Sequence, residues 1–152
     1  MVAPRHRLFF DTSVYMAALL SPEGAGGELL RLVEAGALTM VVSERVVTEA
    51  DQVLGKKFPG LIQESRNLWK SLGPEIAPDP PPKAVARFLK RLHPNDAAIL
   101  CSAQMARVSA FVTWNTRDFM KPRISALVSF PIVIPADALK LFREWLEPFF
   151  EP

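Results

Sequence analysis

The segment Arg7–Val14 places the strongest constraint on the fold, because a short apolar run stops abruptly at a carboxylate. Such a run, ended by Asp11 and followed by two small hydroxyl residues, is typical of a buried strand whose last residue emerges at the carboxyl edge of a parallel sheet. Ligands bind outside that edge in open parallel sheets, so Asp11 is a candidate site residue. Capping of the following helix explains an Asp here equally well, and other carboxylates at the same edge would decide between the two.

Further strands of this kind alternate with helical segments, which predicts an α/β fold. The expected strands lie at 38–42, 109–113 and 131–135, and the proline-rich stretch 77–82 is a linker or a short edge strand. Helical spacing and end signals predict helices at 12–20, from about 22 to 36, after Ser43, and at 59–72, 83–92, 94–106 and 137–146.

Length and composition narrow the class of protein. A chain of 152 residues that is 49% hydrophobic suits one domain spanning 1–152. Its net charge of +2 is too mild for binding of nucleic acid through bulk electrostatics. A single cysteine, Cys101, excludes a disulfide framework and a cysteine-based zinc site. With neither a signal-peptide pattern nor a membrane-spanning apolar run in the sequence, we expect a cytoplasmic protein.

Two more carboxylates are predicted to face inward. Glu49 lies at the margin of the apolar arc of its helix, where we expect a cation to compensate it; a simple salt bridge there is the structural alternative. That arc comprises Val46, Val47, Ala50, Val53 and Leu54. Asp96 points the same way as the buried face of the next long helix, although an acid in a first turn is also favoured by the helix dipole. That face comprises Ile99, Leu100, Ala103 and Ala106.

The strand 109–113 repeats the opening pattern, because a polar loop follows it. Asn115 and Asp118 are therefore placed at a strand outlet as Asp11 is, and capping of a short turn is the alternative for Asp118. The basic helix 83–92 is read as solvated surface, with a contact to phosphates as the weaker alternative. Its cations are Lys83, Arg87, Lys90 and Arg91.

Taken in order, these segments resemble the PIN domain family and, within it, the VapC-type ribonuclease toxins. The matching pieces are Phe10–Val14, Val46–Glu49, Asn95–Leu100, Val112–Phe119 and Pro135–Asp137. The resemblance implies a three-layer α/β/α domain with a central parallel sheet and an acidic pocket at its carboxyl edge. It also implies binding of Mg²⁺ or Mn²⁺, cleavage of single-stranded RNA, a VapB-like antitoxin partner and a homodimer.

Carried over by position, the resemblance makes Asp11, Glu49 and Asp96 the core catalytic and metal-binding acids. Some members have an acid where this chain has Asn115, so Asp118 is the candidate fourth ligand. The hydroxyl residues that could orient ligands or water are Thr12, Ser13 and Thr113.

The chemistry agrees with these residue types. Hydrolysis of a phosphodiester needs an activated water and neutralisation of charge, which divalent metals supply, and hard cations prefer oxygen ligands. We therefore expect Asp11, Glu49 and Asp96 to converge in one pocket. The non-enzymatic alternative is a PIN fold that binds RNA or protein with weak or no catalysis. A haloacid-dehalogenase-like phosphatase is disfavoured, because it needs a second Asp where Ser13 stands.

Overall fold

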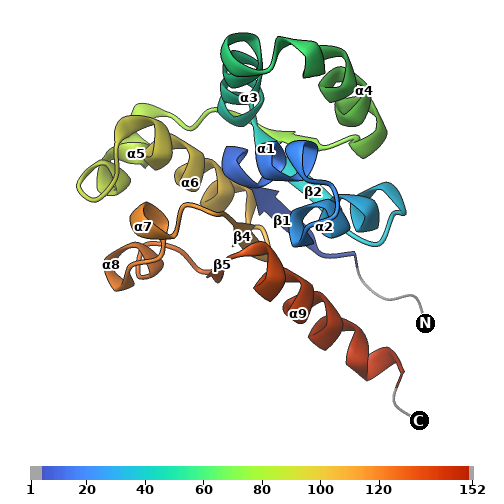
Figure 1. The fold of residues 1–152 in the computed structure, drawn as a ribbon. Coiled ribbons are helices and arrows are strands. Elements are labelled where there is room, and N and C mark those ends of the chain that lie inside the picture. The colour runs from blue at the N-terminus through green and yellow to red at the C-terminus, as the bar shows by residue number, and fades with distance from the viewer. Residues whose placement is uncertain (1–4, 151–152) are drawn as a thin grey trace.

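The computed structural model describes residues 5–150 and shows a parallel sheet between layers of helices (Figure 1). Within these residues the strand order is β3-β2-β1-β4-β5, and every neighbouring pair is parallel. The strands are β1 (Arg7–Phe10), β2 (Thr39–Ser43), β3 (Glu75–Ala77), β4 (Ala110–Val112) and β5 (Ile132–Val133). The central position of β1 explains its continuous apolar run, because both of its faces are covered.

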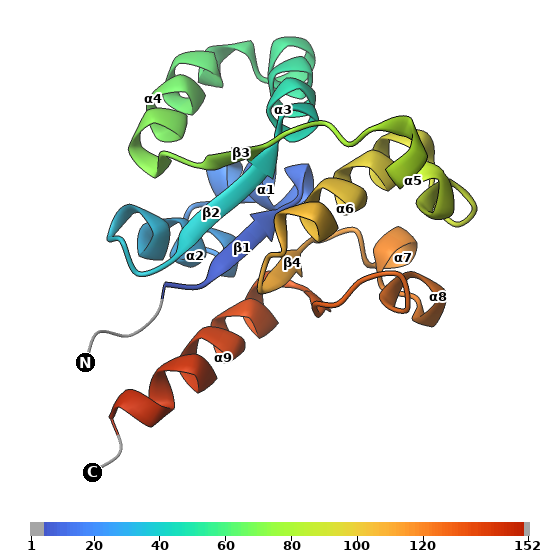
Figure 2. The same cartoon turned by 180° about the vertical axis from the view of Figure 1, so that it is seen from behind.

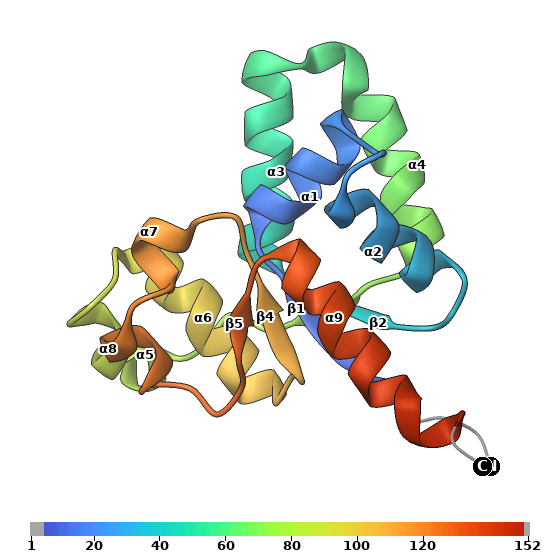
Figure 3. The same cartoon turned by 60° about the horizontal axis from the view of Figure 1, so that its bottom comes forward.

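Helices cover both faces of the sheet, which confirms the three-layer α/β/α fold. Figure 3 shows α5 (Pro82–Leu89) and α6 (Pro94–Ala106) on one side, and α2 (Ala25–Glu34) and α9 (Pro135–Leu146) on the other. The helix α1 (Thr12–Leu20) packs on α2. The short helices α7 (Thr116–Phe119) and α8 (Pro122–Ser125) lie near α5 and α6 (Figure 1).

A helical pair extends beyond the carboxyl edge. Figure 2 shows α3 (Glu44–Lys57) leaving the end of β2 and α4 (Ile62–Leu72) returning to β3, with a short 3₁₀ turn at Pro59–Leu61 between them. Tyr15 of α1 stacks on Trp69 of α4 with ring centroids 3.8 Å apart, and its hydroxyl bonds to Ser65. These contacts fix the pair against the rest of the fold.

Several predicted boundaries differ from the structure by a few residues. The helix expected from Pro22 begins at Ala25, because the chain turns at 22–24 and the backbone of Pro22 crosses closely over Gly27. The last helix begins at Pro135, two residues earlier than expected, with Pro at its first position. The basic helix ends at Leu89, and a turn carries Lys90 and Arg91.

The proline-rich stretch also differs in detail. The edge strand β3 precedes most of this stretch, because prolines cannot donate hydrogen bonds to a neighbouring strand.

None of the helices within residues 5–150 is long and apolar enough to cross a membrane.

The connectivity places a switch point between β1 and β4. From β1 the chain runs outward to β2 and β3, and it then returns to the other side of β1 to form β4 and β5. In doubly wound sheets such a point opens a crevice at the carboxyl edge. The residues that leave these two strands are Asp11 and Thr113.

Candidate metal centre at the carboxyl edge

Asp11 is buried at the switch point, with a residue exposure of 5%. Its backbone N–H donates to the carbonyl of Val112, which extends the β1–β4 ladder by one bond. Although Asp11 occupies the N-cap position of α1, its side chain makes no capping hydrogen bond. Instead, Oδ2 accepts hydrogen bonds from Thr113 Oγ1 at 2.8 Å and from Ser13 Oγ at 3.0 Å. The capping explanation therefore does not account for this carboxylate.

The Asp11 carboxyl group is electrostatically unfavourable where it stands. Burial raises its pKa to about 6 from 3.8, the Thr113 and Ser13 hydrogen bonds act against that rise, and the charge of Asp96 adds to it. No Lys, Arg or His in the described part of the chain forms an ion pair with it. A buried carboxylate without a cation is costly, so this position favours a bound positive charge.

Asp96 links the other acids electrostatically. It lies in the first turn of α6 and is partly buried. Burial raises its pKa, the charges of Asp118 and Glu49 raise it further, and His93 acts against them. Since Asp96 also raises the pKa of Asp11, it interacts with all three of the other candidate acids. Its orientation toward the site, predicted from the helix arc, agrees with these interactions.

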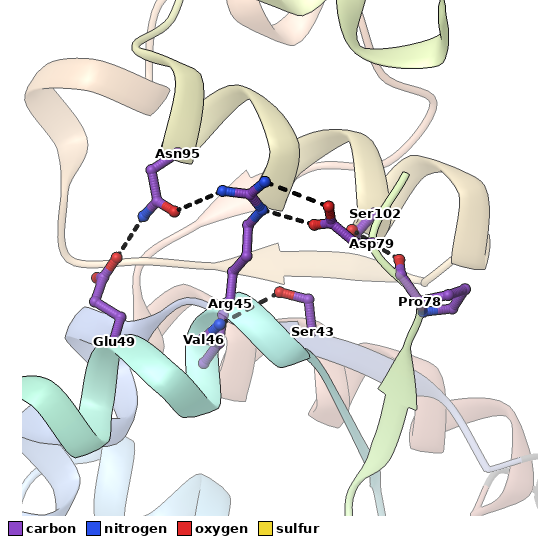
Figure 4. Close-up of polar contacts among 8 residues, drawn as sticks. All are labelled: Ser43, Arg45, Val46, Glu49, Pro78, Asp79, Asn95 and Ser102. Atoms are coloured by element: carbon purple, nitrogen blue, oxygen red, sulfur yellow. Dashed lines mark hydrogen bonds and ion pairs between the residues drawn. The ribbon is translucent and has the colours of Figure 1, made fainter. Parts of the chain in front are cut away.

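Glu49 is compensated by an amide rather than by the cation we expected. Asn95 Nδ2 donates to Glu49 Oε2 at 2.5 Å, and Arg45 Nη1 donates to Asn95 Oδ1 at 3.3 Å (Figure 4). Arg45 also pairs with Asp79 through Nε at 2.6 Å. The positive charge therefore reaches Glu49 only through Asn95, which corrects the sequence-based expectation.

Asp118 and Asn115 form a unit at the start of α7. Asn115 caps the helix, because its Oδ1 accepts from the Asp118 backbone N–H at 3.3 Å, and its Nδ2 donates to Asp118 Oδ2 at 3.1 Å. This hydrogen bond lowers the pKa of Asp118, and the cations Arg117 and Lys121 lower it further. Asp118 is thus an ionised carboxylate, and the capping role suggested for it belongs to Asn115.

The hydroxyl residues connect Asp11 to this loop. Thr113 is fully buried and also accepts from the Asn115 N–H at 2.9 Å, while Ser13 accepts from the Trp114 N–H at 3.0 Å. Thr12 is buried too, and its hydroxyl has no hydrogen-bond partner among the described residues. Two of the three predicted hydroxyl groups therefore position Asp11, and the third does not.

The acids share an edge but do not close around one point. Glu49 and Asn95 line a cavity of about 470 Å³, whereas Asp96 and Asp118 line another of about 350 Å³. Among residues 5–150 no three Asp, Glu, His or Cys side chains are close enough to hold one ion. The expected convergence of Asp11, Glu49 and Asp96 in one pocket is thus incomplete, because Asn95 holds Glu49 in the neighbouring cavity.

The donor set nevertheless fits a hard divalent cation. Its candidate ligands are carboxylate oxygens, and the pKa values of Asp11 and Asp96 are raised first by burial and further by the charges of neighbouring acids. The candidate ligands are Asp11, Asp96 and Asp118, with Glu49 held apart by Asn95, and among the described residues no three of them are close enough to hold one ion as they stand.

Sequence reasoning missed two residues of this arrangement. Asn95 precedes Asp96 in a first helical turn, and an amide beside an inward acid was the available signal. Nothing in the sequence singled out Arg45, because its partners Asp79 and Asn95 are 34 and 50 residues away along the chain.

A doubly wound sheet with carboxylates at its switch point defines an α/β protein with an acidic site at the carboxyl edge. A family model for the PIN domain matches residues 7–117, which include the predicted acids at 11, 49 and 96. The chain belongs to the PIN domain family.

Solved structures agree with the fold. The chain is similar to VapBC2 from Rickettsia felis, solved bound to a DNA fragment from the promoter, with a TM-score of 0.62, 17% identity, and coverage of 84% of this chain and 98% of that chain. It is also similar to PAE2754 from Pyrobaculum aerophilum, with a TM-score of 0.57, 18% identity, and coverage of 94% of this chain and 90% of that chain. At sequence identities this low, the similarity is evidence for a shared fold alone. A search of curated proteins found no match.

Proposed function

We propose that this protein is a metal-dependent endoribonuclease of the VapC toxin type, acting on single-stranded RNA as one domain. PIN domains are generally nucleases, which supports a hydrolase that acts on nucleic acid. The observation that carries the proposal is Asp11, a buried carboxylate at the switch point that is held by two hydroxyl groups and lacks a cation. A structural acid would be neutralised or would cap its helix.

Different residues have different roles in the proposed reaction. A bound Mg²⁺ or Mn²⁺ would supply an activated water and neutralise charge on the scissile phosphate. Thr113 and Ser13 fix the Asp11 carboxylate, and both of their hydrogen bonds are to Oδ2. Asp96, in reach of the other acids, completes the negative site, and Asn115 orients Asp118. Hydrolysis is expected to leave a 5′-phosphate and a 3′-hydroxyl.

The test is cleavage of single-stranded RNA by purified protein with Mg²⁺, Mn²⁺ or EDTA. We expect cleavage with either metal, none in EDTA, and a loss of at least about 100-fold in Asp11→Asn, because removal of one charged ligand weakens the metal site. The matched control is Asp51→Asn, which removes an exposed carboxylate on the outer face of α3. Equal cleavage by Asp11→Asn and the parent protein would contradict the proposal.

The toxin assignment adds two proposed partners, a VapB-like antitoxin and a second copy of the chain. The similarity of the fold to a VapBC2 structure is what supports the antitoxin partner. A small DNA-binding protein encoded beside this chain, co-purifying with it and suppressing RNA cleavage, would support the antitoxin. Light scattering after size exclusion checks the homodimer, and a mass of 16.9 kDa would contradict it.

A second candidate function is a PIN fold that binds RNA or a partner without cutting. The observation in its favour is that Asn115 stands where some members have an acid, while Asn95 keeps Glu49 in a separate cavity. Calorimetric titration with Mn²⁺ discriminates the two candidates. A nuclease takes up the ion and loses that uptake in Asp11→Asn, whereas a binding-only module shows no acid-dependent uptake.

A further inference from the structure

A basic groove adjoins the acids on the α5–α6 side of the site. It is the cavity of about 350 Å³ that holds Asp96 and Asp118, a volume at the lower end of those that bind small ligands. Its other wall carries four basic side chains from two separate segments of the chain, the turn between α5 and α6 and the turn between α7 and α8. These side chains are Lys90, Arg91, His93 and Lys121.

The cations of the basic groove have no structural partners that would explain them. Within residues 5–150, Arg7, Arg45 and Arg117 form ion pairs at 2.5, 2.6 and 3.5 Å. Lys90, Arg91 and Lys121 form none in the same part of the chain. They are exposed, and scattered surface lysines need no explanation, but here the tertiary fold gathers three permanent positive charges around one cavity.

The groove is lined by side chains of both signs, and they interact. Lys121 lowers the pKa of Asp118 and His93 lowers that of Asp96, so the cations lie within electrostatic reach of the acids. A bare acidic edge repels a phosphodiester, which carries the same charge. Cations beside it offset that repulsion and hold neighbouring phosphates of the same strand.

We propose that the basic groove binds the phosphate backbone of single-stranded nucleic acid and delivers it to the acidic site. This inference rests on the proposed function and adds the substrate contacts to it. Lys83 and Arg87 of the basic helix line a neighbouring cavity with Cys101, which shares only Lys90 with the groove. An acidic protein segment is the competing occupant, and binding of polyglutamate tests it.

The test compares two double variants with the same loss of charge. Arg91→Ala/Lys121→Ala removes two cations of the basic groove, and Lys56→Ala/Arg66→Ala removes two exposed cations elsewhere. Binding of a fluorescein-labelled oligouridine is followed by fluorescence anisotropy in EDTA over a range of KCl concentrations. Thermal unfolding of each variant, measured by circular dichroism, confirms that it is folded.

The logarithm of the association constant falls linearly with the logarithm of the salt concentration. We expect this slope to be less steep by about 1.4 in the groove variant, because each phosphate contact on a single strand contributes about 0.7. If the two proteins bind equally near 1 M salt, where electrostatic attraction is screened, this difference in slope makes the binding of the groove variant about 25-fold weaker at about 0.1 M salt. The control variant is expected to keep the slope of the parent protein. An unchanged slope in the groove variant, or no binding by the parent protein in EDTA, would overturn the proposal.

Two further outcomes separate this proposal from the ones it competes with or rests on. If polyglutamate binds the parent protein and loses affinity in the groove variant while oligouridine does not, the groove serves an acidic protein partner and our proposal is wrong. If the groove variant loses oligouridine binding but the parent protein cuts no RNA with Mg²⁺, the groove proposal stands and the proposed nuclease function fails.

Discussion

At the scale of single residues, Asp11 shows how a site is maintained at the expense of stability. The carboxyl group is buried, accepts two hydrogen bonds and has no cation among the described residues. Burial raises its pKa to about 6, above the ordinary value of 3.8. A folded-state pKa above the unfolded one means that the folded protein binds more protons between these values. The free energy of unfolding therefore falls as pH rises from 3.8 to about 6, and Asp11 adds no further loss above that range.

The residue-scale prediction concerns Asp11→Asn in EDTA. The amide keeps an oxygen that accepts the hydrogen bonds of Thr113 and Ser13 but carries no charge to bury. We expect it to raise the free energy of unfolding at about pH 8 by up to about 3 kcal/mol, with the gain narrowing toward pH 4. Urea denaturation at the two pH values measures this. A variant less stable than the parent protein at both would show that Asp11 is structural.

At the scale of elements, close packing at one helix and free space at another explain the different roles of two glycines. Gly27 lies in α2 beneath the turn that follows α1, and a Cβ there would stand 2.0 Å from the carbonyl oxygen of Pro22. Gly55 lies in α3, where a Cβ would meet nothing within 4 Å. The first glycine permits the close turn between α1 and α2, whereas the second only weakens its helix.

The element-scale prediction is a pair of matched substitutions. Gly27→Ala is expected to lower the free energy of unfolding by about 1–3 kcal/mol, because backbone has to move to admit the methyl group. Gly55→Ala is expected to raise it by about 0.5–1 kcal/mol, since alanine loses less backbone freedom in a helix. Urea denaturation of both variants gives the two differences. Equal effects of the same sign would show that α2 does not pack against the Pro22 turn as described.

At the scale of the whole molecule, the candidate site depends on the complete fold. Asp11 follows β1, Glu49 lies in α3, Asp96 in α6 and Asp118 in α7. No two of them share an element, and their interactions connect segments from the first strand to the short helices before β5. An ion held by these acids binds only the folded protein, so its binding energy adds to the stability of the whole chain.

The prediction at this scale is stabilisation by Mg²⁺. At a concentration about tenfold above the dissociation constant, the free energy of unfolding is expected to rise by about 1.4 kcal/mol. The increase should disappear in Asp11→Asn and Asp96→Asn and persist in Asp51→Asn. Thermal unfolding with and without Mg²⁺ measures it, independently of RNA cleavage. An increase that survives in both site variants would place the ion elsewhere on the protein.

Local patterns in the sequence sufficed for most of the fold. Continuous apolar runs predicted the buried strands, because both faces of a parallel strand are covered, and Asp11 ended the first of them as expected. The cap at Ser43 and the stop at Gly73 were also readable, since each depends on neighbours within a few residues. The start of α2 was placed too early because Pro22 belongs to the turn that packs on Gly27, and not to the first turn of the helix.

By itself the sequence predicted which carboxylates would lie at the carboxyl edge, since strand ends and helix arcs are set by local spacing. Only the tertiary structure decided what each carboxylate contacts there. The bonds from Thr113 to Asp11 and from Asn95 to Glu49 join residues 102 and 46 positions apart, and Lys121 meets Lys90 and Arg91 across one cavity. The physical reason is that hydrogen bonds and cavities depend on side chains brought together by packing, which spacing along one segment does not specify.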